Sequence, residues 1–274
     1  MYIGIDVGGT SIKLASFKTL YLPKAVKVIE FKTQNNYKND FGNLTKTISE
    51  LAKSKVSGIG IGIAAVLDED KTQILKANNI KSWEKQALKN DLENLFKCKI
   101  VLENDATCAA LGEAKFGYGV GKDFLFITWG TGIGGTCVRL INNQVYTIPS
   151  ELGHQIVKWQ GIFDNCGQHG CLQAYCGGNG IARLYGKSAK NLSENEWREV
   201  EQRFAHGLLN VLTINPVNLV IFAGSVALNQ KKKLENIEVI VRDKLKIFQA
   251  PQFLISKYQN DIGLYGAIAL LRRS

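Results

Sequence analysis

The 274-residue sequence lacks any long uninterrupted hydrophobic run. No apolar stretch reaches the roughly 18 residues that a membrane-spanning helix needs, so an integral membrane protein is excluded. A secretory-signal pattern is also missing, because Met1, Tyr2 and Ile3 lead directly into a predicted strand. We therefore expect a cytoplasmic protein with no membrane partner.

The sequence also lacks the charge pattern of a nucleic-acid surface. Lys and Arg number 34 against 24 Asp and Glu, a net charge of +10. Most of the excess is scattered, as at Lys53 and Lys55, and no stripe interleaves basic with aromatic residues. We interpret the excess as solvated surface that also suits anionic ligands such as nucleotide phosphates, and we expect no nucleic-acid partner.

The six cysteines occur without an export signal, which favours reduced thiols or metal ligands over disulfides. Three stand singly in apolar surroundings and are predicted to pack in a core: Cys98, Cys108 and Cys137. The other three are clustered: Cys166, Cys171 and Cys176.

A glycine turn separates the first two predicted strands, residues 2–6 and 12–17. A strand follows the turn and no Gly-Lys-Thr or Gly-Lys-Ser is present there, so it is not a Walker loop. Adjacent Gly8 and Gly9 allow backbone amides to approach an anion closely. Asp6, at the end of the first strand, could hold a hydrated metal ion, and an ordinary hairpin is the alternative.

The same pattern recurs in the middle of the chain. Residues 124–129 are predicted as a strand, residues 130–136 as a glycine-rich turn and residues 137–141 as a second strand. The turn matches the spacing of a dinucleotide fingerprint, but a strand follows it where that motif requires a helix. The repeat indicates two related half-molecules facing each other, each with a phosphate turn, and a nucleotide bridging the cleft.

Three polar residues end the predicted strand at residues 98–102: Glu103, Asn104 and Asp105. A helix is predicted to begin at Ala106, so these side chains belong at the carboxyl edge of a sheet, where α/β proteins keep their sites. We interpret Asp105 as a general base, and the alternative is a helix N-cap.

The remaining segments complete an alternating α/β pattern. The glycine-laced stretch 58–67 is predicted as a strand whose small residues allow close packing, and residues 144–150 as irregular. A helix from residue 172 is expected to break at residues 177–180, and residues 223–226 to form a third small-residue turn. Further helices are predicted at residues 43–53, 83–96, 196–212, 234–246 and 262–272, and strands at 218–222 and 253–257.

Taken together and in this order, several motifs resemble the ROK family of sugar kinases and sugar-responsive repressors. They are Asp6-x-Gly8-Gly9-Thr10, Glu103-Asn104-Asp105-Ala106, Gly130-Thr131-Gly132-x-Gly134-Gly135, Glu151-x-Gly153-His154, Cys166-Gly167-x-x-Gly170-Cys171 and Ala223-Gly224-Ser225-Val226. The resemblance spans nearly the whole chain. It implies an α/β fold of two actin-like (ribonuclease H-like) ATPase domains around a cleft. Residues 1–106 plus 262–274 would form the smaller domain, and residues 107–261 the larger.

The resemblance implies transfer of a phosphoryl group from ATP to a hydroxyl of a hexose or N-acetylhexosamine, usually O6, as with glucose or N-acetylmannosamine. Asp105 matches the family's catalytic base, and Asp6 would bind Mg²⁺ through water. The residues matched to the nucleotide are Gly8, Gly9, Thr10, Gly130, Thr131, Gly132, Gly134 and Gly224. Those matched to the sugar are Asn104, Glu151, His154, Gln173 and Ala65. A homodimer is also implied.

The chain departs from the family pattern at the metal motif, which runs Cys-x-Cys-Gly-x-x-Gly-Cys-x-Glu with the histidine of Glu-x-Gly-His as the fourth ligand. Asp164 replaces the first cysteine, which leaves His154, Cys166 and Cys171. Zn²⁺ accepts an aspartate oxygen, so Asp164 could complete a tetrahedron. His169 or Cys176 could also compensate, and a metal-free loop with two buried thiols is an equal alternative.

Other departures fall near the expected sugar. Gln173 replaces the closing glutamate, Ala64 and Ala65 replace a Pro-Gly pair, and residues 145–150 are shorter than the usual glycine-rich stretch. These changes leave a non-catalytic sugar-binding relative open as an alternative. A sugar-responsive regulator would carry a helix-turn-helix domain before Asp6, and the sequence has no room for one.

Overall fold

The computed structural model describes residues 1–272, which divide into two compact units. The first contains residues 1–120 and 261–272, and the second residues 121–260. The predicted boundary at residue 106 is therefore corrected. Helix α3 (Asp105–Phe116) stays with the first unit because it packs on helix α9 (Ile262–Leu270), where Gly112 lies against the backbone of Gly266.

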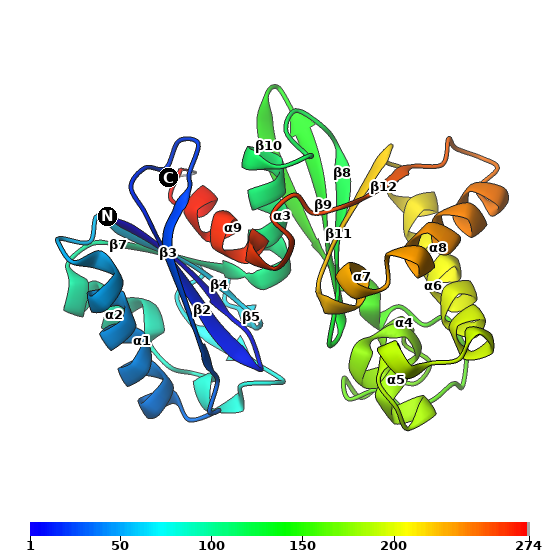
Figure 1. Ribbon diagram of the computed structural model, residues 1–274, viewed down its shortest axis with the longest axis horizontal. Helices are drawn as coiled ribbons and strands as arrows, with labels where there is room; N and C mark the ends of the chain where they lie inside the picture. The colour runs from blue at the N-terminus through cyan, green and yellow to red at the C-terminus, as the bar shows by residue number, and fades with distance from the viewer. Residues whose placement is uncertain (273–274) are drawn as a thin grey trace. The chain divides into compact units, whose positions relative to one another are not determined.

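The first unit is built on a five-stranded sheet in the order β3-β2-β1-β4-β7 (Figure 1). Strands β1, β2 and β3 are antiparallel neighbours, whereas β4 and β7 run parallel to β1. Their bounds are β1 Tyr2–Val7, β2 Ser11–Phe17, β3 Ala25–Lys32, β4 Gly58–Ile63 and β7 Lys99–Asn104. A separate two-stranded sheet is formed by β5 (Val66–Leu67) and β6 (Ile74–Lys76).

The second unit repeats this topology in the order β10-β9-β8-β11-β12. Again three antiparallel neighbours are followed by two parallel strands. The bounds are β8 Phe124–Trp129, β9 Ile133–Ile141, β10 Gln144–Ser150, β11 Leu219–Ala223 and β12 Gln252–Ile255. The prediction of two related halves, each with a glycine turn between its first two strands, is confirmed.

In the first unit, helices cover both faces of the sheet. Ile3, Ile5 and Val7 alternate onto one face, where they pack with α1 (Tyr37–Ala52) and α2 (Leu88–Phe96). The opposite face receives α9, which lies beside α3 (Figure 1).

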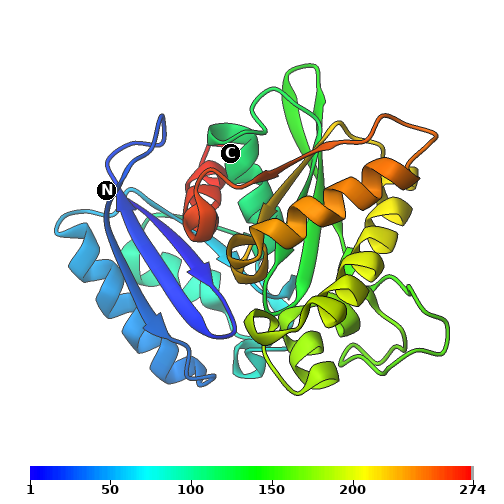
Figure 2. The same ribbon diagram turned by 45° about the vertical axis from the view of Figure 1, so that its right-hand side comes forward.

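In the second unit, the core lies between the sheet and a layer of helices. Trp129 stacks on Phe204 with ring centroids 4.4 Å apart. Helices α6 and α8 lie side by side in this layer (Figure 2). The helices of this unit are α4 Leu172–Cys176, α5 Gly178–Tyr185, α6 Glu194–Ile214, α7 Ser225–Asn229 and α8 Lys231–Lys244. Short 3₁₀ turns occur at Lys81–Trp83 in the first unit, at Leu152–His154 and Ala189–Asn191 in the second, and at Gln259–Asp261 where the chain passes from the second unit to the first.

Several predicted elements were wrong in extent or type. Strand β3 was not predicted, and β10 replaces a segment that was expected to be irregular, since both are polar edge strands paired on one side only. Strand β9 begins at Ile133, so the second turn comprises only residues 130–132. Helix α5 begins where a break was expected, because the amides of Gly178 and Asn179 donate to the carbonyls of Gly130 and Thr131.

The glycines of β4 provide room for a helix backbone, as expected. A Cβ atom on Gly60 would overlap the carbonyl of Ala267 in α9, and one on Gly4 in β1 would lie 2.6 Å from the carbonyl oxygen of Leu264. Only glycine permits so close an approach. Among the described residues, no helix is both long and apolar enough to cross a membrane.

We predict that Gly60→Ala lowers the free energy of unfolding by about 1–3 kcal/mol or more, because the added methyl group overpacks the contact between β4 and α9. The matched control is Gly42→Ala, in the exposed middle of α1, where a Cβ atom meets nothing within 4 Å. That change should raise stability by about 0.5–1 kcal/mol. Urea titration of both variants checks this, and a Gly60→Ala protein as stable as the wild type would contradict it.

Candidate functional site

The parallel register of the first sheet brings the predicted acidic residues to one edge. Asp6 in β1 pairs with Gly62 in β4, which pairs with Glu103 in β7. One position further along, the carboxyl ends of the strands meet, and Asn104 and Asp105 follow directly. The predicted sheet-edge location of Asp6, Asn104 and Asp105 is therefore what the structure shows.

Asp6 is electrostatically strained in this position. Burial is the main cause, and the nearby Asp105 carboxylate adds to it, so the pKa of Asp6 rises to about 7 although Lys13 acts in the opposite direction. Lys13 faces Asp6 across the β1–β2 hairpin, and its Nζ lies 3.1 Å from an Asp261 carboxylate oxygen. We had not predicted a role for Lys13, although the short hairpin turn after Asp6 fixes this pairing.

Asn104, rather than Asp105, is the N-cap of helix α3. Its Oδ1 accepts hydrogen bonds from the amides of Ala106 at 3.1 Å and Thr107 at 3.2 Å, and its Nδ2 donates to the carbonyl of Ala65 at 3.3 Å. Asp105 is the first residue of the helix and also accepts from the amide of Ala106. The N-cap alternative for Asp105 thus applies to its neighbour.

Glu103 has a structural environment. Its side chain is buried and forms an ion pair with Lys71, and it accepts a hydrogen bond from the amide of Asn104 at 3.0 Å. Removing Lys71 would leave the buried Glu103 carboxylate without a counter-charge, which is unfavourable, so this ion pair stabilises the end of β7.

Two carbonyls of the first glycine turn, residues 8–10, accept hydrogen bonds. Thr33 donates from its hydroxyl to the carbonyl of Gly8 at 2.9 Å and from its amide to that of Thr10 at 3.0 Å. Within the described chain, the amides of Gly9 and Thr10 have no acceptor. Successive unpaired amides form a concavity that suits an anion.

The second glycine turn, residues 130–132, shows the same arrangement. Its Gly130 and Thr131 carbonyls accept from the start of α5, while the amides of Thr131 and Gly132 have no acceptor among residues 1–272. Gly224 packs on this turn with φ of +96°, and a Cβ atom there would lie 2.6 Å from the carbonyl oxygen of Trp129. Gly134, predicted to lie in the turn, is inside β9 and donates to the Thr128 hydroxyl.

Four predicted metal ligands converge in the second unit. One donor atom from each of them lies within 4.8 Å of the others: His154, Asp164, Cys166 and Cys171. His154 Nδ1 and Asp164 Oδ2 are 3.1 Å apart, and the Sγ atoms of Cys166 and Cys171 are 3.6 Å apart. Zinc bonds of about 2.0–2.3 Å in a tetrahedron require ligand separations of roughly 3.3–3.8 Å. The donor set therefore fits a zinc ion, and the two quoted separations lie in or close to that range.

The residues suggested as replacement ligands lie outside this cluster. His169 is exposed and its Nδ1 is 3.1 Å from the carbonyl oxygen of Gly161, while Cys176 is buried and contacts the carbonyl of Val200. Cys108 and Cys137 are buried as predicted, and Cys98 is partly buried.

The carboxyl group at the centre of the cluster favours its ionised form. Burial alone would raise the pKa of Asp164, but hydrogen bonds from Cys166 and Gln173, together with His154, outweigh it and lower that pKa. Burial and the neighbouring Cys166 raise the pKa of Cys171 to about 12. Metal binding would reverse this effect on the thiol, since zinc binds thiolate.

Two predicted sugar ligands adjoin the cluster. Glu151 is exposed, and one of its carboxylate oxygens lies 3.9 Å from His154 Nε2. Gln173 is turned toward the loop: its Nε2 lies 3.2 Å from Asp164 Oδ2, and its Oε1 accepts from the amide of Ile133 at 3.4 Å.

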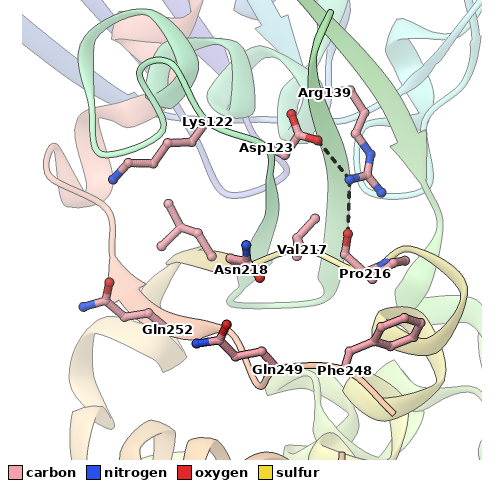
Figure 3. A pocket seen from close by; sticks show the side chains of 10 residues that line it. Lys122, Asp123, Arg139, Pro216, Val217, Asn218, Phe248, Gln249 and Gln252 are labelled. Atoms are coloured by element: carbon pink, nitrogen blue, oxygen red, sulfur yellow. Dashed lines mark hydrogen bonds and ion pairs between the residues drawn. The ribbon is translucent and has the colours of Figure 1, made fainter.

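A surface cavity of about 560 Å³ lies at the end of the second sheet that is opposite to its glycine turn (Figure 3). Lys122, Asn218 and Gln252 line it, next to the amino ends of β8, β11 and β12. Arg139 on its wall bonds Asp123 and the carbonyl of Pro216, both at 3.1 Å. The glycine turn and Gly224 lie at the carboxyl ends of the strands, so this cavity is not part of the predicted site.

The repeated sheets, each with a glycine turn after its first strand, define an actin-like ATPase fold. Residues 2–274 match the model of the ROK family, and the chain belongs to that family. A ROK family glucokinase from Streptomyces griseus, solved in complex with glucose and AMPPNP, has a TM-score of 0.84 and 26% identity over 100% of this chain and 99% of its own.

Relatives known by sequence are named as kinases of two sugars. A glucokinase from Halalkalibacterium halodurans is 36% identical over 198 residues, and the match covers 67% of this chain but only 58% of that protein. An N-acetyl-D-glucosamine kinase from Vibrio cholerae is 27% identical, and the match covers 98% of this chain and 99% of that protein.

We predict that Asp6→Asn stabilises the protein at pH 8 in the absence of Mg²⁺ and nucleotide. The pKa of Asp6 is about 7 in the folded state against 3.8 in the reference state, so its ionised form destabilises the fold increasingly as pH rises from about 4 to 7. At pH 8 the gain should approach at most about 4 kcal/mol, and it should vanish near pH 4.

Thermal melts of Asp6→Asn across this pH range provide the measurement, with Asp70→Asn in an exposed turn as the matched control. A stabilisation by Asp6→Asn that is the same at every pH would contradict the raised pKa of Asp6.

Proposed function

We propose that the protein transfers the γ-phosphoryl group of ATP to a hydroxyl of a hexose or N-acetylhexosamine, with Asp105 as the general base. The observation that carries this proposal is the placement of Asp6 and Asp105 at one sheet edge, where the two carboxyl groups influence each other. Phosphoryl transfer needs positioning, charge neutralisation and a base near the attacking hydroxyl, and this edge supplies suitable groups.

In this proposal the two glycine turns hold the phosphates. Their amides at Gly9, Thr10, Thr131 and Gly132, which have no acceptor among residues 1–272, donate to phosphate oxygens. Asp6 would hold Mg²⁺ through water, and the ion would supply charge neutralisation for the phosphates. The raised pKa of Asp6 supports this role, because a divalent cation relieves the cost of its buried charge. Gly224 lies against the adenosine.

The acceptor is proposed from the names of the relatives and from the motifs. Glucose and an N-acetylhexosamine such as N-acetylmannosamine are the candidates, with O6 as the hydroxyl attacked. Asn104 has few hydrogen-bonding positions left for a sugar, because its Oδ1 caps α3 and its Nδ2 donates to the carbonyl of Ala65. In this proposal it positions the start of α3, and therefore Asp105, and also hydrogen-bonds a sugar hydroxyl. Glu151 is exposed and available for hydroxyl groups. A cytoplasmic location and a homodimer stay predictions.

A non-catalytic sugar-binding protein is the second candidate. One observation favours it: Gln173, matched to a sugar-binding glutamate, is turned toward Asp164. The assay below separates the two candidates, since only an enzyme releases ADP in response to a sugar.

We also propose that His154, Asp164, Cys166 and Cys171 hold a structural zinc ion. All positions of a tetrahedron would be filled by the protein, as in sites that organise a loop rather than activate water. With His154 Nδ1 on the metal, its Nε2 would be oriented toward Glu151 and the acceptor.

We predict that Asp105→Asn lowers kcat by about 10²–10⁴-fold, the usual contribution of a general base, with a smaller change in KM. Coupled ADP release with a panel of hexoses and N-acetylhexosamines measures it, and Asp70→Asn is the control with the same chemical change in an exposed turn. No turnover with any sugar in the wild type would rule out the kinase, and undiminished turnover in Asp105→Asn would rule out this base.

For the metal, we predict about one zinc per chain in protein purified without chelators. Cys166→Ser should remove most of it, because zinc binds thiolate far better than hydroxyl, whereas Cys98→Ser should not, since Cys98 lies outside the cluster. Elemental analysis of the three proteins decides the matter. Well below one zinc in the wild type would refute the site.

A further inference from the structure

Gln173 connects two segments of the second unit. It is the second residue of helix α4 and is half-buried. Its Nε2 donates toward both carboxylate oxygens of Asp164, at 3.2 and 3.5 Å. Its Oε1 accepts from the amide of Ile133, the first residue of β9 after the glycine turn, at 3.4 Å. The carboxamide thus joins the loop of the four-residue cluster to the end of the second turn.

We propose that Gln173 is a positioning residue whose carboxamide locks Asp164 onto the glycine turn, and that residues 164 and 173 form a matched pair in which each identity requires the other. The two positions are also the two places where the cluster motif departs from its family pattern. The lock rests on contacts within one unit and does not depend on phosphoryl transfer; only its metal readout rests on the zinc site proposed above.

The chemistry of the carboxamide makes the match specific. Gln offers a donor at one end and an acceptor at the other, and this contact uses both. A glutamate at position 173 would keep the acceptor for the amide of Ile133. It would also place a second carboxylate about as close to Asp164 as the Gln173 amide nitrogen is now. Two carboxylates so close repel each other, and the donor to Asp164 would be lost.

A cysteine at position 164 would lessen that conflict. It has no oxygen to accept a hydrogen bond from Gln173, and as a thiolate its charge would lie on the single sulfur bound to zinc and not on a carboxylate oxygen that faces position 173. Substituting position 173 should therefore change zinc affinity and Tm much more when position 164 is aspartate than when it is cysteine.

The contact between Gln173 and Asp164 is largely shielded from solvent. Asp164 is only 4% exposed, so solvent does not screen its interaction with Gln173 as it would at the surface. The neighbouring amides are used elsewhere: Gln155 donates to the carbonyl of Leu152, and Gln168 lies against the Cys171 thiol. Among the described residues, Gln173 is the side-chain amide that donates to Asp164.

The lock also relates the loop to the proposed phosphate turn. A Cβ atom on Gly132 would lie 3.0 Å from Gln173 Oε1, so the side chain packs directly on that turn. Distortion at Asp164 is transmitted to residues 132 and 133 through one carboxamide. Gln173 accordingly serves to hold the loop and the turn together.

A double-mutant cycle tests the matched pair, using wild type, Gln173→Glu, Asp164→Cys and the double variant. Zinc affinity is measured by competition with a chromophoric chelator, and Tm is measured in excess chelator. In the wild-type background Gln173→Glu should weaken zinc binding by about 10–100-fold, the usual cost of losing a partner of a metal ligand, and should lower Tm. In the Asp164→Cys background it should change zinc affinity less than about 3-fold.

Gln160→Glu, an exposed change of the same kind in the same unit, is the control and should alter neither quantity in either background. If a variant fails to fold, Gln173→Met keeps the side-chain volume without either hydrogen bond and should lower Tm in chelator only where Asp164 is present. Equal effects of Gln173→Glu in both backgrounds, or none in either, would overturn the proposal. No sugar or ATP enters these assays, so failure of the kinase proposal would not alter their outcome.

Discussion

The parallel pairing of β1, β4 and β7 is the constraint on which the candidate site depends. Because the three strands run in register, their carboxyl ends stop at one edge, and Asp6 and Asp105 are held near each other although they are distant in sequence. The fold bears an electrostatic cost for this, seen in the raised pKa of Asp6. Glycines at positions 4 and 60 let the backbone of α9 pack closely on two of these strands, β1 and β4.

Much of this arrangement was predictable from local patterns. The buried strands, the two glycine turns and the polar residues at the end of β7 have short-range signals that tertiary structure did not override. Strand β3 and strand β10 carried no such signal, because each pairs on one side only and has mixed polarity. The domain boundary was wrong for a different reason: only the packing of Gly112 on Gly266 reveals that α3 belongs with the first unit.

The candidate site also combines features that the sequence indicated with contacts that only the structure reveals. Motif order indicated Asp105, the turns and the four-residue cluster, and Asp164 converges with the three ligands that the resemblance to the family implied, namely His154, Cys166 and Cys171. Sequence could not reveal that Lys71 pairs with the buried Glu103 or that Gln173 bonds Asp164, since each contact joins separate segments. The departures from the family pattern at Asp164 and Gln173 therefore appear as isolated changes in sequence but form one contact in space.

The central claim is that this sheet edge directs a phosphoryl group to a sugar hydroxyl rather than to water. The most direct measurement is ³¹P NMR of the protein with ATP, Mg²⁺ and each candidate sugar. We expect a phosphate monoester resonance coupled to a sugar proton to grow as the γ-phosphate resonance of ATP declines, with little inorganic phosphate. Stable ATP with every sugar, or inorganic phosphate as the sole product, would contradict the account.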